Sequence, residues 1–259
     1  MESDDKQKIR EAYNGYALSY MQRRKEGSTV AHDFIEKPAM YSKIPDVKGK
    51  SVLVIGCGHG DECKHLKALG AKRIVGIDLS EKMIELAQKE NPDLEFYQMD
   101  MEELNFPEDI FDFVYSSLAM HYLKDWTKAL LSVKKVLKRE GNFLFSTHNP
   151  VMWSAKRTRT ENERGSILGY VKYLKEDRCE VFGDYLNTRK ITDLWYDEFE
   201  ISYYHKSFSS IMKDIITSGF QVTDVLEPKA LSEAKNKAKT FWEIREKIPL
   251  FIIFELQKV

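Results

Sequence analysis

The stretch of residues 52–60 constrains the fold of this chain more than any other part of its sequence. Its first four residues, Val-Leu-Val-Ile, are apolar and mostly β-branched, and they predict a strand that is buried on both faces. Three alternating glycines follow, and residues 62–69 have a helical pattern that Gly70 ends. A strand, a glycine turn and a helix in this order are typical of an open α/β sheet, in which glycines let backbone N–H groups approach a ligand. A tight turn without a ligand is the alternative that this motif alone leaves open.

Length and composition narrow the class of protein. The chain has 259 residues, of which 42% are hydrophobic and 12% aromatic, enough for one large α/β domain with an insertion. A formal net charge of -1 argues against a large nucleic-acid or membrane-binding surface. The three cysteines are not spaced as a disulfide framework or a zinc site. Because we find no signal-peptide pattern and no long apolar run, we expect a soluble, cytoplasmic protein.

Strand and helix patterns alternate from Lys50 to Thr147, which predicts a parallel sheet with right-handed crossovers. After the first strand and helix, a second strand ends at Asp78, and Ser80 is the expected N-cap of the next helix. A third strand ends near Asp100. The expected later strands cover residues 111–115 and 142–146, with a helix at 126–137 between them.

An aromatic stripe marks the N-terminal segment. Tyr13, Tyr16 and Tyr20 are spaced to lie on one face of a helix over residues 6–25, which we expect to break at Gly15 and to end near Gly27. This helix either packs its tyrosines on the core or forms a lid over a ligand site, where the phenols supply hydroxyl groups.

The regular alternation stops after Pro150. Residues 151–206 are polar and aromatic, and a connection of this length usually carries function or structure of its own. We interpret it as an insertion that caps the sheet, with strands near 178–185 and 199–204. The α/β pattern resumes with a helix at 208–217 and strands at 220–226 and 250–256. The insertion could line an apolar acceptor pocket or form its own small core; its aromatic residues are Trp153, Tyr170, Tyr173, Phe182, Tyr185, Trp195, Tyr196, Tyr203 and Tyr204, and its arginines are Arg157, Arg159, Arg164, Arg178 and Arg189.

Acidic residues follow the second and third strands, in line with the glycine turn. Ligands of open α/β sheets bind at the carboxyl ends of the strands. Asp78 can there accept hydrogen bonds from both hydroxyls of a ribose, and Asp100 can accept one from the amine of an adenine. Either aspartate alone could be a turn or capping residue, but together with the glycine turn they predict a nucleoside-containing ligand.

With these motifs the chain resembles the class I S-adenosylmethionine-dependent methyltransferases, and most of all their small-molecule branch, which includes the ubiquinone and menaquinone biosynthesis enzymes. The resemblance is good over residues 13–147 and weaker over 218–228. The motifs that carry it are Val52-Leu53-Val54-Ile55-Gly56-Cys57-Gly58-His59-Gly60, Gly76-Ile77-Asp78-Leu79-Ser80 with Met83, Asp100-Met101, Phe111-Asp112-Phe113-Val114, Ala119-Met120-His121-Tyr122-Leu123 and residues 137–145.

The resemblance implies an α/β fold, with a doubly wound, mostly parallel, seven-stranded Rossmann-like sheet. It makes residues 1–259 one methyltransferase domain, composed of an N-terminal helical lid (1–48), a cofactor-binding core (49–150 and 207–259) and an inserted substrate cap (151–206) after the fifth strand. Val54 departs from the pattern, because this family often has an acidic residue at that position.

The resemblance also implies roles for individual residues toward S-adenosylmethionine. The glycine turn approaches the methionine moiety, Asp78 holds the ribose, Leu79 or Met83 flanks the adenine, and Asp100 with the Met101 N–H reads the adenine edge. The implied cofactor-binding residues are Tyr13, Tyr20, Gly56, Cys57, Gly58, Gly60, Asp78, Leu79, Met83, Asp100, Met101, Ser116 and Ser117.

The chemistry of the donor limits what the protein must do. A sulfonium methyl group is already activated, so in-line transfer mainly needs positioning, and a base is needed only when the acceptor must lose a proton. His121, His148 and His205 are candidate bases, although each could be a packing or capping residue instead. No catalytic residue is assigned from sequence. We expect a small-molecule acceptor, neither DNA nor membrane as a partner, and a monomer or homodimer.

Four alternatives differ in their sequence requirements. A nicotinamide dehydrogenase with G-x-G-x-x-G would need a glycine where Asp61 stands. A DNA base-amino methyltransferase would need Asn/Asp-Pro-Pro-aromatic where Ser116-Ser117-Leu118-Ala119 stands. A regulatory S-adenosylmethionine-binding protein without turnover and a methyltransferase acting on RNA or protein also stay open. We expect no metal, because the glycine turn already explains Cys57, His59, Cys63 and His65.

Overall fold

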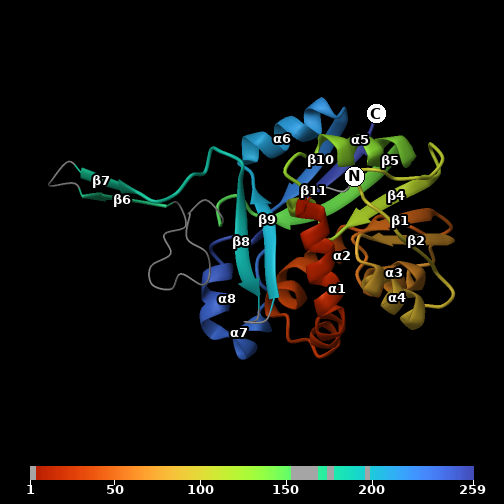
Figure 1. Cartoon of the computed structure of the whole chain (residues 1–259), viewed down its shortest axis with the longest axis horizontal. Coiled ribbons are helices and arrows are strands. Elements are labelled where there is room, and N and C mark those ends of the chain that lie inside the picture. The colour runs from red at the N-terminus through yellow and green to blue at the C-terminus, as the bar shows by residue number, and fades with distance from the viewer. Residues whose placement is uncertain (1–3, 153–168, 174–177, 196–198) are drawn as a thin grey trace.

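The computed structural model describes residues 4–152, 169–173, 178–195 and 199–259, and its centre is one seven-stranded sheet (Figure 1). All pairings are parallel except those of β11, which runs antiparallel to both of its neighbours. The predicted doubly wound α/β fold is therefore confirmed. The strand order is β10 (Phe220–Leu226), β11 (Phe251–Lys258), β5 (Leu137–His148), β4 (Phe111–Ser116), β1 (Ser51–Ile55), β2 (Arg73–Asp78) and β3 (Glu95–Gln98).

The apolar run of β1 is explained by its central position in the sheet. Successive strand side chains point to opposite faces. Leu53 and Ile55 belong to the core cluster on one face, whereas Val52 and Val54 belong to the cluster on the other. Both faces are covered, so every position from 52 to 55 must be apolar.

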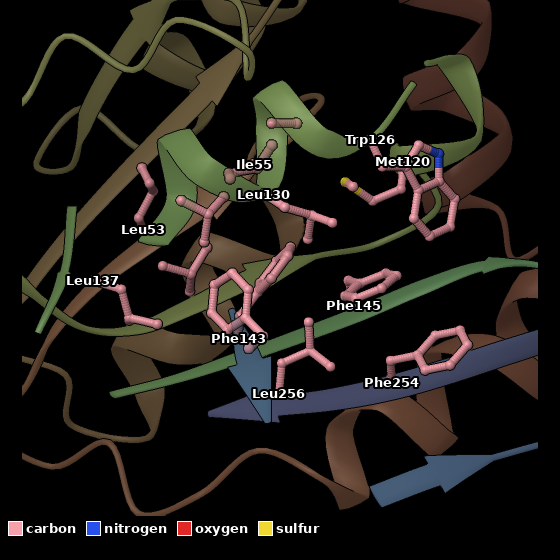
Figure 2. Packing of buried hydrophobic residues seen from close by; sticks show 14 of the residues in the cluster. Leu53, Ile55, Met120, Trp126, Leu130, Leu137, Phe143, Phe145, Phe254 and Leu256 are labelled. Carbon is pink, nitrogen blue, oxygen red and sulfur yellow. The ribbon is translucent and has the colours of Figure 1, made fainter. Parts of the chain in front are cut away.

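Helices cover both faces of the sheet. On one side, α5 (Thr127–Val136) and α6 (Phe208–Thr217) pack their apolar residues onto the aromatic core that Figure 2 shows around Phe143, Phe145 and Phe254. On the other side, α3 (Asp61–Ala68) and α4 (Glu81–Glu90) bury Cys63 and Ile84. The predicted N-cap of α4 is confirmed, because the Ser80 hydroxyl accepts a hydrogen bond from the Met83 N–H at 3.1 Å.

The predicted N-terminal helix is present as α1 (Asp4–Lys25), but the break expected at Gly15 is wrong. A glycine inside a helix costs only about 1 kcal/mol relative to alanine. The burial of the neighbouring Tyr16 and Ala17 stabilises the helix by more than the glycine costs. The predicted end is confirmed: α1 stops just before Gly27, which has a φ of +63°. A π-helical turn, η1 (His32–Glu36), and α2 (Lys37–Ser42) follow.

The insertion contributes two antiparallel hairpins, β6–β7 (Tyr170–Tyr173 and Arg178–Val181) and β8–β9 (Arg189–Trp195 and Phe199–His205). Strands were predicted where β7 and β9 lie, but β6 and β8 were not. The second hairpin lies beside α1 (Figure 1). Between them, Phe199 and Tyr16 stack with ring centroids 4.4 Å apart. Some of the singled-out insertion residues lie outside the described residues, namely Trp153, Tyr196, Arg157, Arg159 and Arg164.

Two short helices, α7 (Ala234–Lys237) and α8 (Lys239–Arg245), precede β11 and were not predicted. Ala234 is buried with Ile35 of η1 and with Leu250 and Phe251 at the start of β11. This segment therefore joins the N-terminal region to the start of β11.

Candidate active site

A cavity of about 150 Å³ lies where β1, β2 and β4 end, and α1 and β8 also line it. The parallel sheet brings these strand ends together, although they are far apart in sequence. Gly60 and Ser116, which were predicted to bind the cofactor, do not line the cavity. The predicted residues that do line it are Tyr13, Tyr20, Gly56, Cys57, Gly58, Asp78, Leu79, Met83, Asp100, Met101 and Ser117.

The glycine turn has a backbone that other residues rarely adopt. Gly56 has a φ of +66°, and a Cβ there would lie 2.7 Å from the Cβ of Ala119. Gly60, at the N-cap of α3, has a φ of +89° and would bring a Cβ to 2.7 Å from Asn91. These two positions therefore need glycine for both conformation and space.

Asp78 connects the glycine turn to the end of β2. Its Oδ2 accepts a hydrogen bond from the Gly58 N–H at 2.9 Å, and its Oδ1 accepts one from the Ser80 N–H at 2.9 Å. Burial raises the pKa of this carboxyl above 3.8, although the backbone N–H groups act in the opposite direction. Each oxygen keeps acceptor capacity beyond these bonds, so the carboxylate can still bind hydroxyl groups of a ligand.

Helix α1 is tied to the ends of β2 and β3. Lys6 forms ion pairs with Asp100 and Glu102, and the Ser80 hydroxyl donates to the Asn14 side chain at 2.6 Å. Tyr13 and Tyr122 join their hydroxyls in a hydrogen bond. The helix thus lines the cavity and also packs on the hairpin β8–β9.

A buried charged network at the cavity wall was missed by sequence reasoning. Arg24 donates from Nη2 to Glu62 at 3.1 Å, and its Nη1 is buried without a hydrogen-bond partner among the described residues. His32 Nε2 lies 3.1 Å from Glu36 Oε2, and the other Glu36 oxygen accepts from Ser117 at 2.8 Å. No motif links α1, η1 and β4, so only their packing could reveal this group.

The pKa values of the His32–Glu36 pair show mutual stabilisation of the charges. Burial by itself would raise the pKa of Glu36, but the charge of His32 and its hydrogen bonds outweigh burial and lower it. Burial would likewise lower the pKa of His32, yet Glu36 leads the effects that raise it. Each group therefore favours the charged form of the other.

Two of the three candidate bases lie at the cavity. His121, on the 3-10 turn η2 (Met120–Tyr122), stacks on His148 with ring centroids 3.8 Å apart and an interplanar angle of 10°. Burial lowers the pKa of His121 to about 3, which keeps its ring neutral. His205 is not brought to this cavity: its Nε2 lies 2.9 Å from the Tyr185 carbonyl oxygen, beside a smaller cavity near Trp126.

The thiol and serine groups near the turn are buried. Burial, together with the neighbouring Cys63, raises the pKa of Cys57 well above 9.0, so this thiol is protonated. The Ser116 hydroxyl has no hydrogen-bond partner among the described residues. Within the described part of the chain, no group of three or more His, Cys, Asp or Glu residues is arranged to hold a metal ion.

Comparisons with known proteins point to one family. Residues 53–145 match the family model described as "Methyltransferase domain". The structure of an S-adenosylmethionine-dependent methyltransferase from Mesorhizobium loti is similar with a TM-score of 0.68 and 27% identity, over 89% of this chain and 99% of that one. This chain is a class I S-adenosylmethionine-dependent methyltransferase.

Sequences similar to this methyltransferase occur in bacteria. A Haemophilus influenzae protein is 28% identical over 86% of this chain and 87% of its own. The malonyl-[acyl-carrier protein] O-methyltransferase of Yersinia pestis is 29% identical over 55% of this chain, a match that spans about half (51%) of that enzyme. The methyl donor of this methyltransferase is S-adenosylmethionine. In the described residues we find no helix with the length and apolarity that a membrane crossing requires.

Proposed function

We propose that this methyltransferase transfers the methyl group of S-adenosylmethionine to a small-molecule acceptor by in-line displacement. One observation carries the proposal: the glycine turn, Asp78 and Asp100 line a single cavity that α1 covers. The sulfonium of the bound donor supplies an activated methyl group. The chain's own residues orient the reactants and exclude water.

The proposed cofactor contacts follow from the positions of the side chains. Asp78 binds the ribose hydroxyls while its bonds to Gly58 and Ser80 fix its orientation. Asp100 binds the adenine amine. Lys6 of α1, which forms an ion pair with the Asp100 carboxylate, regulates access of the ligand to that carboxylate. Arg24 is a contact that the sequence did not suggest: its buried Nη1 is suited to the carboxylate of the methionine moiety.

A small acceptor is favoured by how the cavity is covered. Helix α1 and β8 both line it, which leaves little room for the surface of a macromolecule. The likeness to a methyltransferase of malonyl-[acyl-carrier protein] supports an acceptor that presents a small reacting group. For the whole chain we propose the division into lid (1–48), core (49–150 and 207–259) and cap (151–206), a cytoplasmic location, a monomer or homodimer, and no binding of DNA.

The experiment measures binding of S-adenosylhomocysteine by calorimetry, with NAD as a comparison. We expect the purified chain to bind S-adenosylhomocysteine and Asp78→Asn to bind it at least about tenfold more weakly, because a ribose contact is lost. Asp93→Asn is the matched control, since Asp93 forms its ion pair with Lys67 on the exposed surface. Binding of NAD in place of S-adenosylhomocysteine would contradict the proposal.

A second measurement separates an enzyme from a regulatory binding protein. The chain is incubated with methyl-labelled S-adenosylmethionine and a bacterial extract of metabolites from which macromolecules have been removed. We expect label to appear in this small-molecule fraction. Labelling of RNA or protein alone, when those are supplied instead, would contradict the proposed acceptor class.

A further inference from the structure

Part of the cavity wall is not used by the proposed cofactor contacts. It consists of Leu118, His121, Tyr122, His148 and Trp195. Leu118 follows β4, His121 and Tyr122 lie on η2, and His148 ends β5, but Trp195 comes from β8 in the insertion. The core and the insertion therefore share this wall, which is where an acceptor must meet the methyl group.

The aromatic side chains of this wall are held by one residue behind them. Tyr203, fully buried on β9, lies edge-on to His121 at 5.9 Å and to His148 at 4.8 Å, measured between ring centroids. The same ring contacts Trp195 at 6.3 Å. Tyr203 itself is anchored by its hydroxyl, which donates to Asp193 at 3.1 Å. The wall is thus rigid and preorganised.

Polar atoms in this wall lack the partners that burial normally demands. Both ring nitrogens of His121 and the indole nitrogen of Trp195 are buried without a hydrogen-bond partner among the described residues. Leaving such groups unpaired costs about 1–3 kcal/mol each. Their gathering on a cavity wall is what a ligand-binding surface requires, because the ligand then supplies the missing bonds.

From these observations we propose that His121 and Trp195 form the acceptor subsite and select an uncharged, planar acceptor with a hydroxyl group beside a carbonyl group. This inference rests on the proposed function. The hydroxyl donates to a ring nitrogen of His121, and the carbonyl oxygen accepts from the indole N–H of Trp195. The stacked rings and the indole contact the flat faces of such a molecule. A charged acceptor is rejected, because these residues offer no opposite charge.

The chemistry of the step is balanced within this arrangement. The hydroxyl oxygen of the acceptor forms the new bond to the methyl carbon, and the carbon–sulfur bond breaks with its electron pair going to sulfur. As the oxygen gains its methyl group it becomes strongly acidic, so a weakly basic imidazole suffices to take its proton. Burial lowers the pKa of His121 to about 3, so the ring is neutral and ready to accept that proton before transfer.

The test uses the full chain saturated with S-adenosylhomocysteine and three probes of one shape. Salicylamide carries the hydroxyl and carbonyl, benzamide lacks the hydroxyl, and salicylate is charged. We expect calorimetry to show salicylamide binding at least about tenfold more tightly than either of the others. Equal binding of all three, tighter binding of salicylate, or no binding of salicylamide would overturn the proposal.

Two substitutions assign the effect to the named atoms. Trp195→Phe and His121→Phe keep an aromatic ring but remove the polar nitrogens, and each is expected to weaken salicylamide binding about 3- to 10-fold. Trp242→Phe on α8, outside the cavity lining, is the matched control. Unchanged binding in both variants overturns the proposal. Binding of S-adenosylhomocysteine to the unmodified chain is measured before any probe is added. If this binding is absent, the proposed function has failed rather than the acceptor subsite.

Discussion

At the scale of single residues, three positions with positive φ angles line the cavity. Gly56 and Gly58 have positive φ angles, and so does Leu118, with a φ of +50°. A non-glycine residue in this region costs roughly 1–3 kcal/mol and persists only where its surroundings hold it. The Leu118 N–H donates to the Ser146 hydroxyl at 3.0 Å, and that hydroxyl in turn donates to Glu36 at 2.5 Å. The buried Glu36 therefore fixes the strained wall of the site.

Gly56→Ala tests the steric argument for the glycine turn. We expect a loss of about 2–4 kcal/mol in the free energy of unfolding, from the positive φ together with the clash against Ala119. Urea unfolding gives the value. Gly49→Ala is the matched control, because Gly49 has a φ of +74° but nothing within 4 Å of an added Cβ. Equal losses in the two variants would rule out the clash.

The lowered pKa of His121 predicts how the free energy of unfolding depends on pH. Its pKa is lowered to about 3 in the folded chain and is near 6.5 when unfolded, so between these values the unfolded chain binds more protons. Its neutral ring therefore contributes stability that is complete above pH 6.5 and is lost as pH falls toward 3, by up to about 1.4 kcal/mol per pH unit.

The measurement compares the unmodified chain with His121→Phe by urea unfolding at pH 7, 6 and 5. We expect the variant to lose less stability than the unmodified chain over this range. Lowered pKa values are also found for His59, His65 and His205, which both proteins contain. The difference in pH dependence between the two proteins therefore reports on His121. Identical slopes would show that His121 does not titrate in this way.

At the scale of elements, α1 connects three parts of the molecule. It reaches the strand ends through Lys6, the start of α4 through Asn14 and the hairpin β8–β9 through Tyr16. A helix that makes these contacts while it lines the cavity connects the cavity wall to the insertion. The π-helical turn η1 then places His32 and Glu36 beneath the same cavity.

Gly15→Ala tests whether α1 is held by packing in spite of its glycine. Gly15 is exposed, and nothing lies within 4 Å of an added Cβ. We therefore expect stabilisation by about 0.5–1 kcal/mol, because alanine favours the helix. Gly27→Ala, at a φ of +63° just beyond the helix, is expected to destabilise the chain. Thermal unfolding distinguishes the two, and a destabilised Gly15→Ala variant would refute the explanation.

At the scale of the whole molecule, stability comes from two apolar cores on the two faces of one sheet. Leu130 of α5 is fully buried in the core that Figure 2 shows, whereas its neighbour Leu131 is 50% exposed. Helical periodicity puts adjacent residues on different faces, so the two leucines differ in burial but not in type.

The contrast between Leu130 and Leu131 predicts how much stability is lost when a cavity is created in the core. Leu130→Ala is expected to lower the free energy of unfolding by about 2–5 kcal/mol, because it leaves a cavity. Leu131→Ala is expected to change it by less than about 0.5 kcal/mol. Urea unfolding of both variants checks the difference, and similar losses would mean that α5 does not pack as described.

Much of the fold, and most of the predicted residues that line the candidate site, could be predicted from the sequence, because the signals are local. The apolar run at Val52–Ile55 and the glycine turn after it depend on neighbouring residues only. Parallel strands end at the same edge of a sheet, so Asp78 and Asp100 were expected at one place without knowledge of any contact. The fold class and a nucleoside-containing ligand follow from that register, and the resemblance to the class I methyltransferases adds the methyl donor.

Only the tertiary structure decided which other side chains join the site. Arg24, His32 and Trp195 line the cavity because α1, η1 and β8 pack on the sheet, and no periodicity carries that information. Packing also extended α1 through Gly15 and kept His205 away from the cavity. The sequence by itself determined the sheet, its glycine turn and the donor. Contacts between distant segments determined the rest of the cavity wall, since they depend on burial summed over the whole molecule.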